Sequence, residues 1–427
     1  MRKVFLVALL LCSLSAVAQS VKDEIKKNIA ASASNYRAYP GPTQAKLTPA
    51  PKGKKPFYIS HYGRHGSRYL ISRQEYYYAF HTLTKAHQLG KLSELGEDVL
   101  HRVQLLKEES EGRLGDLTAL GAQQHKDIAR RMYERLPDVF ADDCHIDARS
   151  TVVLRCVLSM ENALQQLLLK NPRLSISHDA SYHDMYYMNQ QDRKLTALPQ
   201  QARSREAFLD YCKKRPTWQR MVPLLFNDTA YVNHDINGER LNQHLFKLAS
   251  IVQNSDLRKR VTLYDLFTDD EIYTNWQKEN VYWFLSYGQT TLNGGQLPFI
   301  QRNLLRRMIA EADSCLRLPH PSASLRYGHE TIVLPLTCLL GINGYDQNIS
   351  DLEQLEKKGW ANYRIFPMAS NIQLVFYRDS PADADILLKV LLNENEATLP
   401  LKTDCAPYYH WTDFRDYYTK KLDSYKE

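Results

Sequence analysis

The sequence predicts an α/β protein with a central mixed sheet flanked by helices and interrupted by an inserted, mainly helical domain. Short apolar segments that alternate with helical patterning occur in the first and last parts of the chain. Between residues 181 and 293 the chain is rich in Tyr, Lys and Arg, and strand signals are few. A length of 427 residues, with 44% hydrophobic and 24% charged composition, is typical of a globular protein with a sizeable core.

The first 18 residues have the pattern of a secretory signal peptide. Two cations precede an apolar run from Val4 to Leu11, and Ala16-Val17-Ala18 is a small-x-small cleavage signal. A membrane anchor is the weaker interpretation, because the run is about half of the ~20 residues that a spanning helix needs. Cys12 follows three leucines, which disfavours lipid modification. We therefore expect export after cleavage near Ala18, to the periplasm, the cell surface or the medium, and no integral membrane span.

After the leader, residues 19–54 have little periodicity and are expected to form an arm over the surface. Residues 55–180 then predict the first part of the α/β domain, beginning with a strand at Lys55–Ser60 and a polar loop at His61–Arg68. Ligands bind at the carboxyl ends of strands in open α/β sheets, so this loop is a candidate site.

Helical patterning follows to about Glu111 and again from Leu117 to Leu136. A second strand is predicted at Cys144–Ala148, before a helix for which Ser150 is the expected N-cap. Residues 181–293 form the expected helical insert. Residues 294–427 form the second part of the α/β domain, with strands predicted at Ser324–Gly328, Ile372–Tyr377 and Ile386–Leu392.

Charge and cysteine content narrow the classes of function. A formal charge of +7 suits an anionic substrate, and no segment matches a nucleic-acid-binding module. The wide cysteine spacing contains no Cys-x-x-Cys, so we expect no metal site, redox motif or organic cofactor. Disulfides are permitted in an exported protein, with buried free thiols as the alternative. The oligomeric state cannot be inferred from these features.

The segment Arg64-His65-Gly66-Ser67-Arg68 contains groups suited to phosphate ester cleavage. Guanidinium groups bind phosphate oxygens in a bidentate fork and keep their charge at working pH. A neutral His65 can attack phosphorus through one ring nitrogen while the other is held by a carbonyl, and neighbouring arginines should lower its pKa. Gly66 is expected to leave room for the phosphoryl group. A solvated basic turn is the alternative for so short a motif.

A second polar pair, His329-Glu330, follows a predicted strand and begins an apolar helix at Ile332–Leu340. A carboxylic acid at this position can protonate a leaving oxygen. A bound phosphate would raise the pKa of that acid. The alternative role for Glu330 is to interact favourably with the helix dipole.

These motifs together resemble the histidine acid phosphatases, and more narrowly the multiple inositol polyphosphate phosphatases and related phytases. The Arg-His-Gly-x-Arg motif of that family matches residues 64–68, and its His plus acid pair matches His329 and Glu330. Three further segments are similar to family motifs: Leu117-Thr118-x-x-Gly121-x-x-Gln124, Arg149-Ser150-Thr151-x-x-x-Arg155 and Asp184-Met185-Tyr186-Tyr187-Met188. The acid directly follows His329, whereas the inositol phosphatase branch commonly has His-Ala-Glu.

The resemblance implies a phosphoglycerate-mutase-like fold and a set of roles for the site residues. His65 is the nucleophile and Glu330 the proton donor, while Arg64, Arg68, Arg155 and His329 bind the phosphoryl group. The implied activity is metal-independent hydrolysis of a small phosphorylated molecule, such as phytate, through a phosphohistidine. Without the resemblance, Arg155 would be taken as a surface residue opposite an apolar helical stripe.

Three alternatives remain open: a broad-specificity acid or sugar-phosphate phosphatase, a non-catalytic phosphate-ligand binding protein, and a mutase-like phosphotransferase. Cations of the insert, at Arg203, Arg205, Lys213-Lys214-Arg215 and Arg220, could line a polyphosphate pocket, although a solvated helix face is the more common origin of such a pattern.

Overall fold

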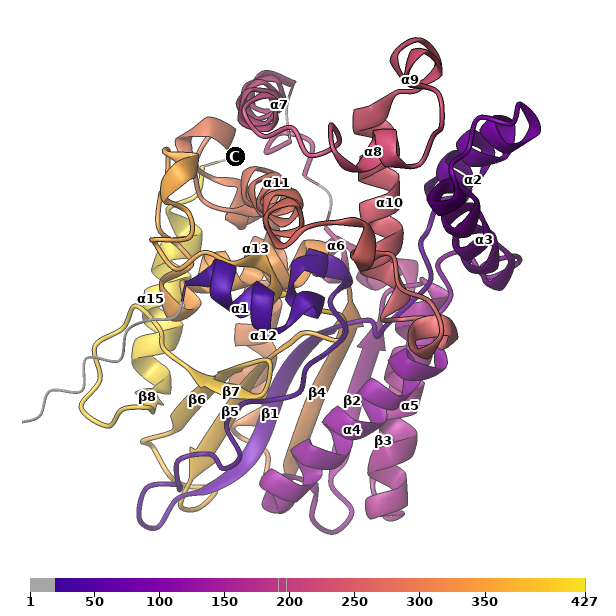
Figure 1. The fold of residues 1–427 in the computed structure, drawn as a ribbon. Helices are drawn as coiled ribbons and strands as arrows, with labels where there is room; N and C mark the ends of the chain where they lie inside the picture. The colour runs from indigo at the N-terminus through magenta and orange to yellow at the C-terminus, as the bar shows by residue number, and fades with distance from the viewer. Residues whose placement is uncertain (1–19, 191, 197, 427) are drawn as a thin grey trace, which may run out of the picture.

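The computed structural model describes residues 20–190, 192–196 and 198–426, so the expected signal peptide at residues 1–18 lies outside the described residues. Within these residues, eight strands form one mixed sheet in the order β3-β2-β4-β1-β5-β6-β7, with β8 paired to β6 (Figure 1). The strands are β1 Lys55–Arg64, β2 His145–Ser150, β3 Ser175–Asp179, β4 Pro321–Gly328, β5 Asn371–Arg378, β6 Leu387–Leu392, β7 Asn395–Ala397 and β8 Tyr409–His410. This arrangement confirms the predicted α/β class with a central mixed sheet.

Strand β1 is the centre of the sheet. It pairs in parallel with β4 and antiparallel with β5. Alternate side chains of a strand point to opposite faces, and accordingly Tyr58 and Tyr62 enter one hydrophobic core while Ile59 enters another. Both faces of the strand are therefore covered, which explains its nearly continuous burial.

Helices cover the two faces in separate groups. On the Ile59 side lie α4 Ala119–Arg135 and α5 Leu154–Lys170, and on the tyrosine side lie α12 Arg302–Cys315, α13 Glu330–Leu340 and α15 Trp411–Asp423. Figure 1 shows α4 and α5 beside β2 and β3, away from α15.

A helical layer lies beyond the carboxyl end of β1 (Figure 1). It contains α7 Leu198–Lys213, α8 Met221–Leu224, α9 Thr229–Asp235, α10 Gly238–Val252 and α11 Asp269–Tyr287. The short helix α6 Met185–Met188 instead packs on the face of the sheet with α12, where Tyr62 donates a hydrogen bond to the Met188 carbonyl. Two earlier helices, α2 Arg73–Gln88 and α3 Glu94–Glu109, share a hydrophobic core with α10. Packing thus joins the predicted insert to helices that precede β2, and the domain boundaries at 181 and 293 stay a prediction.

The amino-terminal arm is partly buried, contrary to the expected surface position. After α1 Val21–Lys27, the 3-10 helix η1 Ile29–Tyr36 buries residues 31–35. Asn362 on the short helix α14 Asn362–Ile365 donates a hydrogen bond to Ser34 Oγ at 2.7 Å. The small side chains of the arm allow this close packing.

Two local predictions were also wrong. Strand β1 continues through Arg64, so His61 to Arg64 are strand rather than loop, because β4 and β5 supply pairing partners on both sides. Ser150 pairs with Tyr327 at the end of β2, and α5 begins later, after Val153, without a side-chain cap. Within the part of the chain that the structure describes, none of the helices combines the length and apolar character needed to cross a membrane.

Candidate active site

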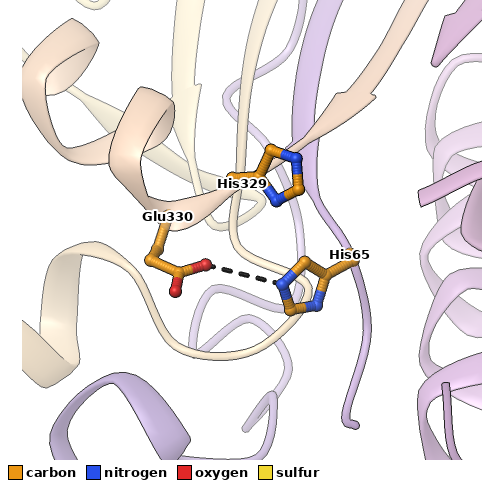
Figure 2. A group of neighbouring side chains, drawn as sticks. All are labelled: His65, His329 and Glu330. Atoms are coloured by element: carbon orange, nitrogen blue, oxygen red, sulfur yellow. Dashed lines mark ion pairs between the residues drawn. The ribbon is translucent and has the colours of Figure 1, made fainter. Parts of the chain in front are cut away.

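The two sequence motifs meet because β1 and β4 are parallel neighbours that end at the same level. Arg64 is in register with Gly328, the last residue of β4. The backbone N–H of His65 donates to the Gly328 carbonyl at 2.8 Å. Residues 65 and 329, which follow these strands, are therefore placed side by side at one edge of the sheet. Figure 2 shows His65, His329 and Glu330 grouped there.

The His65 ring is oriented as a nucleophile requires. Its Nδ1 lies 2.9 Å from the carbonyl oxygen of Gly66. A carbonyl only accepts, so Nδ1 carries the proton and Nε2 keeps its lone pair. Nε2 is buried without a hydrogen-bond partner and lies 3.5 Å from Glu330 Oε2 (Figure 2). Burial, reinforced by Arg64 and Arg155, holds the pKa of His65 well below its usual value and keeps the ring neutral.

The direction of that pKa shift was predicted, but burial is its main cause rather than the flanking arginines. Gly66 also has a packing role, and its expected role in phosphoryl access stays a prediction. A Cβ at Gly66 would lie 2.4 Å from the carbonyl oxygen of Gly121 in α4. Gly66 is thus required for packing against α4, whatever the position of a phosphoryl group.

The beginning of α4 fixes the loop that carries His65. Gln124 Oε1 accepts from the backbone N–H of Ser67 at 2.9 Å, and Thr118 Oγ1 donates to the Ser67 carbonyl at 3.1 Å. Thr118 also caps α4 by accepting from the N–H of Gly121. This explains physically why Leu-Thr-x-x-Gly-x-x-Gln accompanies the histidine motif.

Arg64 and Arg68 carry unpaired donors into the site. The Nη1 of Arg64 donates to the carbonyls of Asn35 and Phe366 at 2.7 and 2.9 Å. Its Nε and Nη2, and the Nε of Arg68, are buried without hydrogen-bond partners. Buried polar groups are usually paired, so these donors indicate an anion-binding position.

Arg155 joins them from α5. It is half-buried, and its Nε has no hydrogen-bond partner. Burial lowers its pKa, and its charge lowers the pKa of both His65 and His329. The structure therefore places Arg155 with the other site residues, whereas helical periodicity alone predicted a surface position.

Glu330 balances part of this positive charge. Its Oε2 lies 3.0 Å from Arg64 Nε, although the two are not aligned as a hydrogen bond, and its Oε1 lies 4.0 Å from Arg68 Nη2. Burial raises the pKa of Glu330, but the positive charges of Arg64 and Arg68 outweigh burial and hold it well below the usual value. Glu330 is thus a carboxylate in this state.

His329 is the N-cap residue of α13 and contacts residues that follow β2. Thr151 Oγ1 lies 3.2 Å from its Nε2, and Cys156 Sγ lies 3.8 Å from the same nitrogen. Burial lowers the pKa of His329 to about 4. The ring is therefore neutral near pH 7 and can donate a hydrogen bond to an oxygen.

Ligand atoms of His65, His329 and Glu330 lie within 4.8 Å of one another, a spacing that could hold a metal ion. The positive charges of Arg64, Arg68 and Arg155 act on these histidines and on Glu330, which favours an anion over a cation. The residues thus suit a phosphoryl group better than a metal.

A cleft of about 460 Å³ extends from this group toward the helical layer. Its wall includes aromatic residues of η1, α7, α10 and α11. It also includes the charged residues Arg68, Glu330, Lys247, Lys278 and Glu279. Lys247 Nζ lies 3.0 Å from Glu75, and Lys278 Nζ lies 3.1 Å from Glu239. The lysines of the cleft are thus already paired with carboxylates.

Four of the cations singled out in the insert have other positions or partners. Arg215 pairs with Glu353 and Arg220 with Glu271, while Arg205 and Lys213 line other cavities. Sequence reasoning missed the cleft lysines and Glu279. Lys278 and Glu279 lie on α11, which buries residues around much of its circumference. The spacing of apolar residues therefore could not indicate which side of this helix faces the cleft.

A buried neutral histidine with a free Nε2, guanidinium donors without partners and a facing carboxylate define a phosphate-binding site of a histidine phosphatase. The family model of the histidine phosphatase superfamily, branch 2, matches residues 18–393. The chain belongs to this family and is a phosphatase of its second branch.

Individual relatives agree with this assignment. A segment of 110 residues is 28% identical to multiple inositol polyphosphate phosphatase 1 of Dictyostelium discoideum, which covers 25% of this chain and 17% of that protein. The fold is similar to the multiple inositol polyphosphate phosphatase of Bifidobacterium longum in complex with inositol hexasulfate, with a TM-score of 0.74, 18% identity and coverage of 90% of this chain and 96% of the other. The phytase of D. castellii is also similar, with a TM-score of 0.66, 12% identity and coverage of 92% and 85%.

Proposed function

We propose that this chain is an exported phosphomonoesterase that hydrolyses inositol polyphosphates such as phytate through a phosphohistidine on His65. The observation that carries the chemistry is the free, buried Nε2 of a neutral His65 beside the unpaired donors of Arg64 and Arg68. A protein that only bound phosphate would need the arginines but not this nucleophile.

In the proposed first step the Nε2 lone pair attacks phosphorus and the bond to the alcohol oxygen breaks. Glu330 gives its proton to that oxygen, so the alcohol leaves neutral. Arg64, Arg68, Arg155 and His329 stabilise the charge on the phosphoryl oxygens. In the second step water attacks the phosphohistidine, Glu330 takes a proton, and the bond between phosphorus and nitrogen breaks to release phosphate.

The carboxylate state of Glu330 fits this cycle because the substrate changes its surroundings. A bound phosphoryl group competes with Glu330 for Arg64 and Arg68, and its own negative charge disfavours the carboxylate. Both effects raise the pKa of Glu330. Glu330 is therefore proposed to be protonated in the substrate complex and ionised in the free enzyme.

The inositol polyphosphate substrate is supported by the relatives, which include multiple inositol polyphosphate phosphatases and a phytase. Lys247 and Lys278 lie on the wall of the same cleft, although each is paired with a carboxylate. Export is supported by the leader pattern at residues 1–18.

One observation favours a second candidate, a sugar-phosphate or similar monoesterase with a free-hydroxyl substrate. Glu279 lines the cleft, and burial raises its pKa while Lys247 lowers it. A carboxyl group there accepts hydrogen bonds from hydroxyls and disfavours additional phosphates. Because Glu75 and Glu239 already pair with the two lysines, the wall is less cationic than its lysine content suggests.

Phosphate release from phytate, glucose 1-phosphate and p-nitrophenyl phosphate, with a chelator present, tests the two candidates between about pH 4 and 7.5, where a neutral His and a titrating carboxyl coexist. Strong preference for phytate supports the proposal, whereas preference for glucose 1-phosphate supports the second candidate. Glu279→Gln should raise the phytate to glucose 1-phosphate ratio of kcat/KM if Glu279 faces the substrate. Glu206→Gln, which alters an exposed carboxyl of α7 outside the cleft, is the matched control and should leave the ratio unchanged.

A further inference from the structure

A second group of ligating side chains lies near the carboxyl end of the chain. Atoms of Asp404, Cys405 and His410 lie within 4.8 Å of one another, although sequence spacing predicted no metal site. Asp404 and Cys405 belong to the segment between β7 and β8, and His410 ends β8. We propose that these three residues form a zinc site.

The ligand types and distances fit zinc. Thiolate, imidazole and carboxylate are the groups that bind Zn²⁺ in proteins. His410 Nε2 lies 3.1 Å from Asp404 Oδ1, and two N or O ligands of a tetrahedral zinc are about 3.3 Å apart. The thiol of Cys405 needs a small movement, because a sulfur and a nitrogen ligand are about 3.6 Å apart.

The other ring nitrogen of His410 supplies an independent feature. Nδ1 lies 2.6 Å from Asp385 Oδ1. A metal-binding histidine usually donates its second N–H to a carboxylate, which fixes the tautomer and the ring orientation. With the proton on Nδ1, the lone pair of Nε2 faces the carboxylate of Asp404. This arrangement needs either a bound cation or a second proton on the ring.

The chain around Cys405 is held in place before any metal binds. Thr403 Oγ1 accepts from the N–H of Cys405 at 3.3 Å and donates to the carbonyl of Tyr408 at 2.6 Å. Lys54 forms an ion pair with Asp385, which orients that carboxylate. Cys405 is half-buried and forms no disulfide. Its thiol donates to the carbonyl of Tyr408 at 3.6 Å, and zinc would displace that proton.

This group lies far from His65. Strand β8 pairs with Leu387 and Leu388, and Leu387 is in register with Tyr377, which faces Pro56 at the beginning of β1. His65 follows the opposite end of β1, about 30 Å away at the usual strand rise. Zinc at Asp404, Cys405 and His410 would connect the β7–β8 segment to the sheet edge without contacting the phosphoryl site.

The experiment uses the metal-stripped mature protein. Zinc binding is measured by competition with a chromogenic chelator, and Co²⁺ is added separately to detect the thiolate-to-cobalt absorption band. Wild type is expected to bind about one equivalent at this site. Cys405→Ser and His410→Asn should lose that zinc and the cobalt band but keep phosphatase activity. Cys315→Ser, which alters another half-buried free thiol, should keep the zinc, the cobalt band and the phosphatase activity.

Two further variants make the result decisive. Asp385→Asn should weaken zinc binding about 10- to 100-fold, as expected for a group that orients a ligand. If zinc is lost in His65→Ala and retained in Cys405→Ser, the metal binds at the catalytic group and the proposal is wrong. Absence of stoichiometric zinc in wild type would also overturn the proposal. In unmodified protein, zinc should also protect Cys405, but not Cys315, from thiol labelling.

Discussion

The inner pocket, formed by His65, Glu330 and the three arginines, contrasts with the outer cleft wall, formed by Lys247, Lys278 and Glu279. In the inner pocket, guanidinium donors are buried without hydrogen-bond partners. On the outer wall both lysines already have carboxylate partners. An unpaired buried donor costs free energy until a ligand accepts its hydrogen bond. A lysine that is already paired with a carboxylate contributes much less free energy to ligand binding. The chemistry should therefore depend on the inner pocket and substrate preference on the outer wall.

The largest expected effect is the loss of the nucleophile. His65→Ala should reduce kcat by a factor on the order of 10⁴ or more, because a bound water cannot replace a positioned covalent nucleophile. Steady-state hydrolysis of p-nitrophenyl phosphate measures this. Phosphate binding by the variant serves as the control for folding, since the arginines remain. Activity within tenfold of wild type would exclude His65 as the nucleophile.

The effect of Glu330→Gln should depend on the leaving group. An alcohol needs the proton that Glu330 supplies, so hydrolysis of an alkyl phosphate should slow by about 10²- to 10⁴-fold. p-Nitrophenolate leaves without protonation, and its ester should be much less affected. Comparison of the two substrates in the same variant separates proton donation from charge effects at Arg64. Equal losses for both substrates would refute the proton-donor role.

A third comparison tests the inner pocket against the outer wall directly. Arg155→Ala should lower kcat/KM about 10²- to 10³-fold for every phosphate ester, because it removes a charge that stabilises the transition state. Lys278→Ala should lower kcat/KM by less than about tenfold, since Glu239 already pairs with Lys278. Similar losses in both variants would mean that the pairing seen in the structure does not persist with substrate.

The smallest expected effect concerns stability. Burial lowers the pKa of His61 and His125 to about 3 and that of His329 to about 4. Between about pH 6.5 and these values the unfolded chain binds protons that the folded protein does not. The free energy of unfolding should therefore fall as pH falls below 6.5, by about 1.4 kcal/mol per pH unit for each such histidine.

Urea denaturation between about pH 5 and 7 tests this in wild type and in His125→Gln. The slope of the unfolding free energy against pH should be smaller in the variant by about 1.4 kcal/mol per pH unit, which is the contribution of one proton. This difference does not depend on the change in overall stability. An unchanged slope would show that His125 is not held neutral by the fold.

The sequence predicted the α/β class because strand and helix patterns alternate along the chain. It predicted the residues of the inner pocket because they lie in short motifs of contiguous residues. It failed where position depends on tertiary packing. Arg155 was assigned to the site only through the family resemblance, because helical periodicity reports the apolar face of α5 and not its tertiary neighbours. The close packing of Gly66 against the backbone of Gly121 likewise has no signal in the sequence. Glu279 comes from the helical layer, for which no motif was available.

The stereochemical course at phosphorus tests the central claim most directly. Hydrolysis of a monoester made chiral at phosphorus with oxygen isotopes is followed by analysis of the released phosphoryl configuration. Each in-line displacement inverts phosphorus, so attack by His65 followed by attack of water predicts net retention, even if the phosphohistidine never accumulates. Net inversion would show a single direct attack by water and would contradict the account.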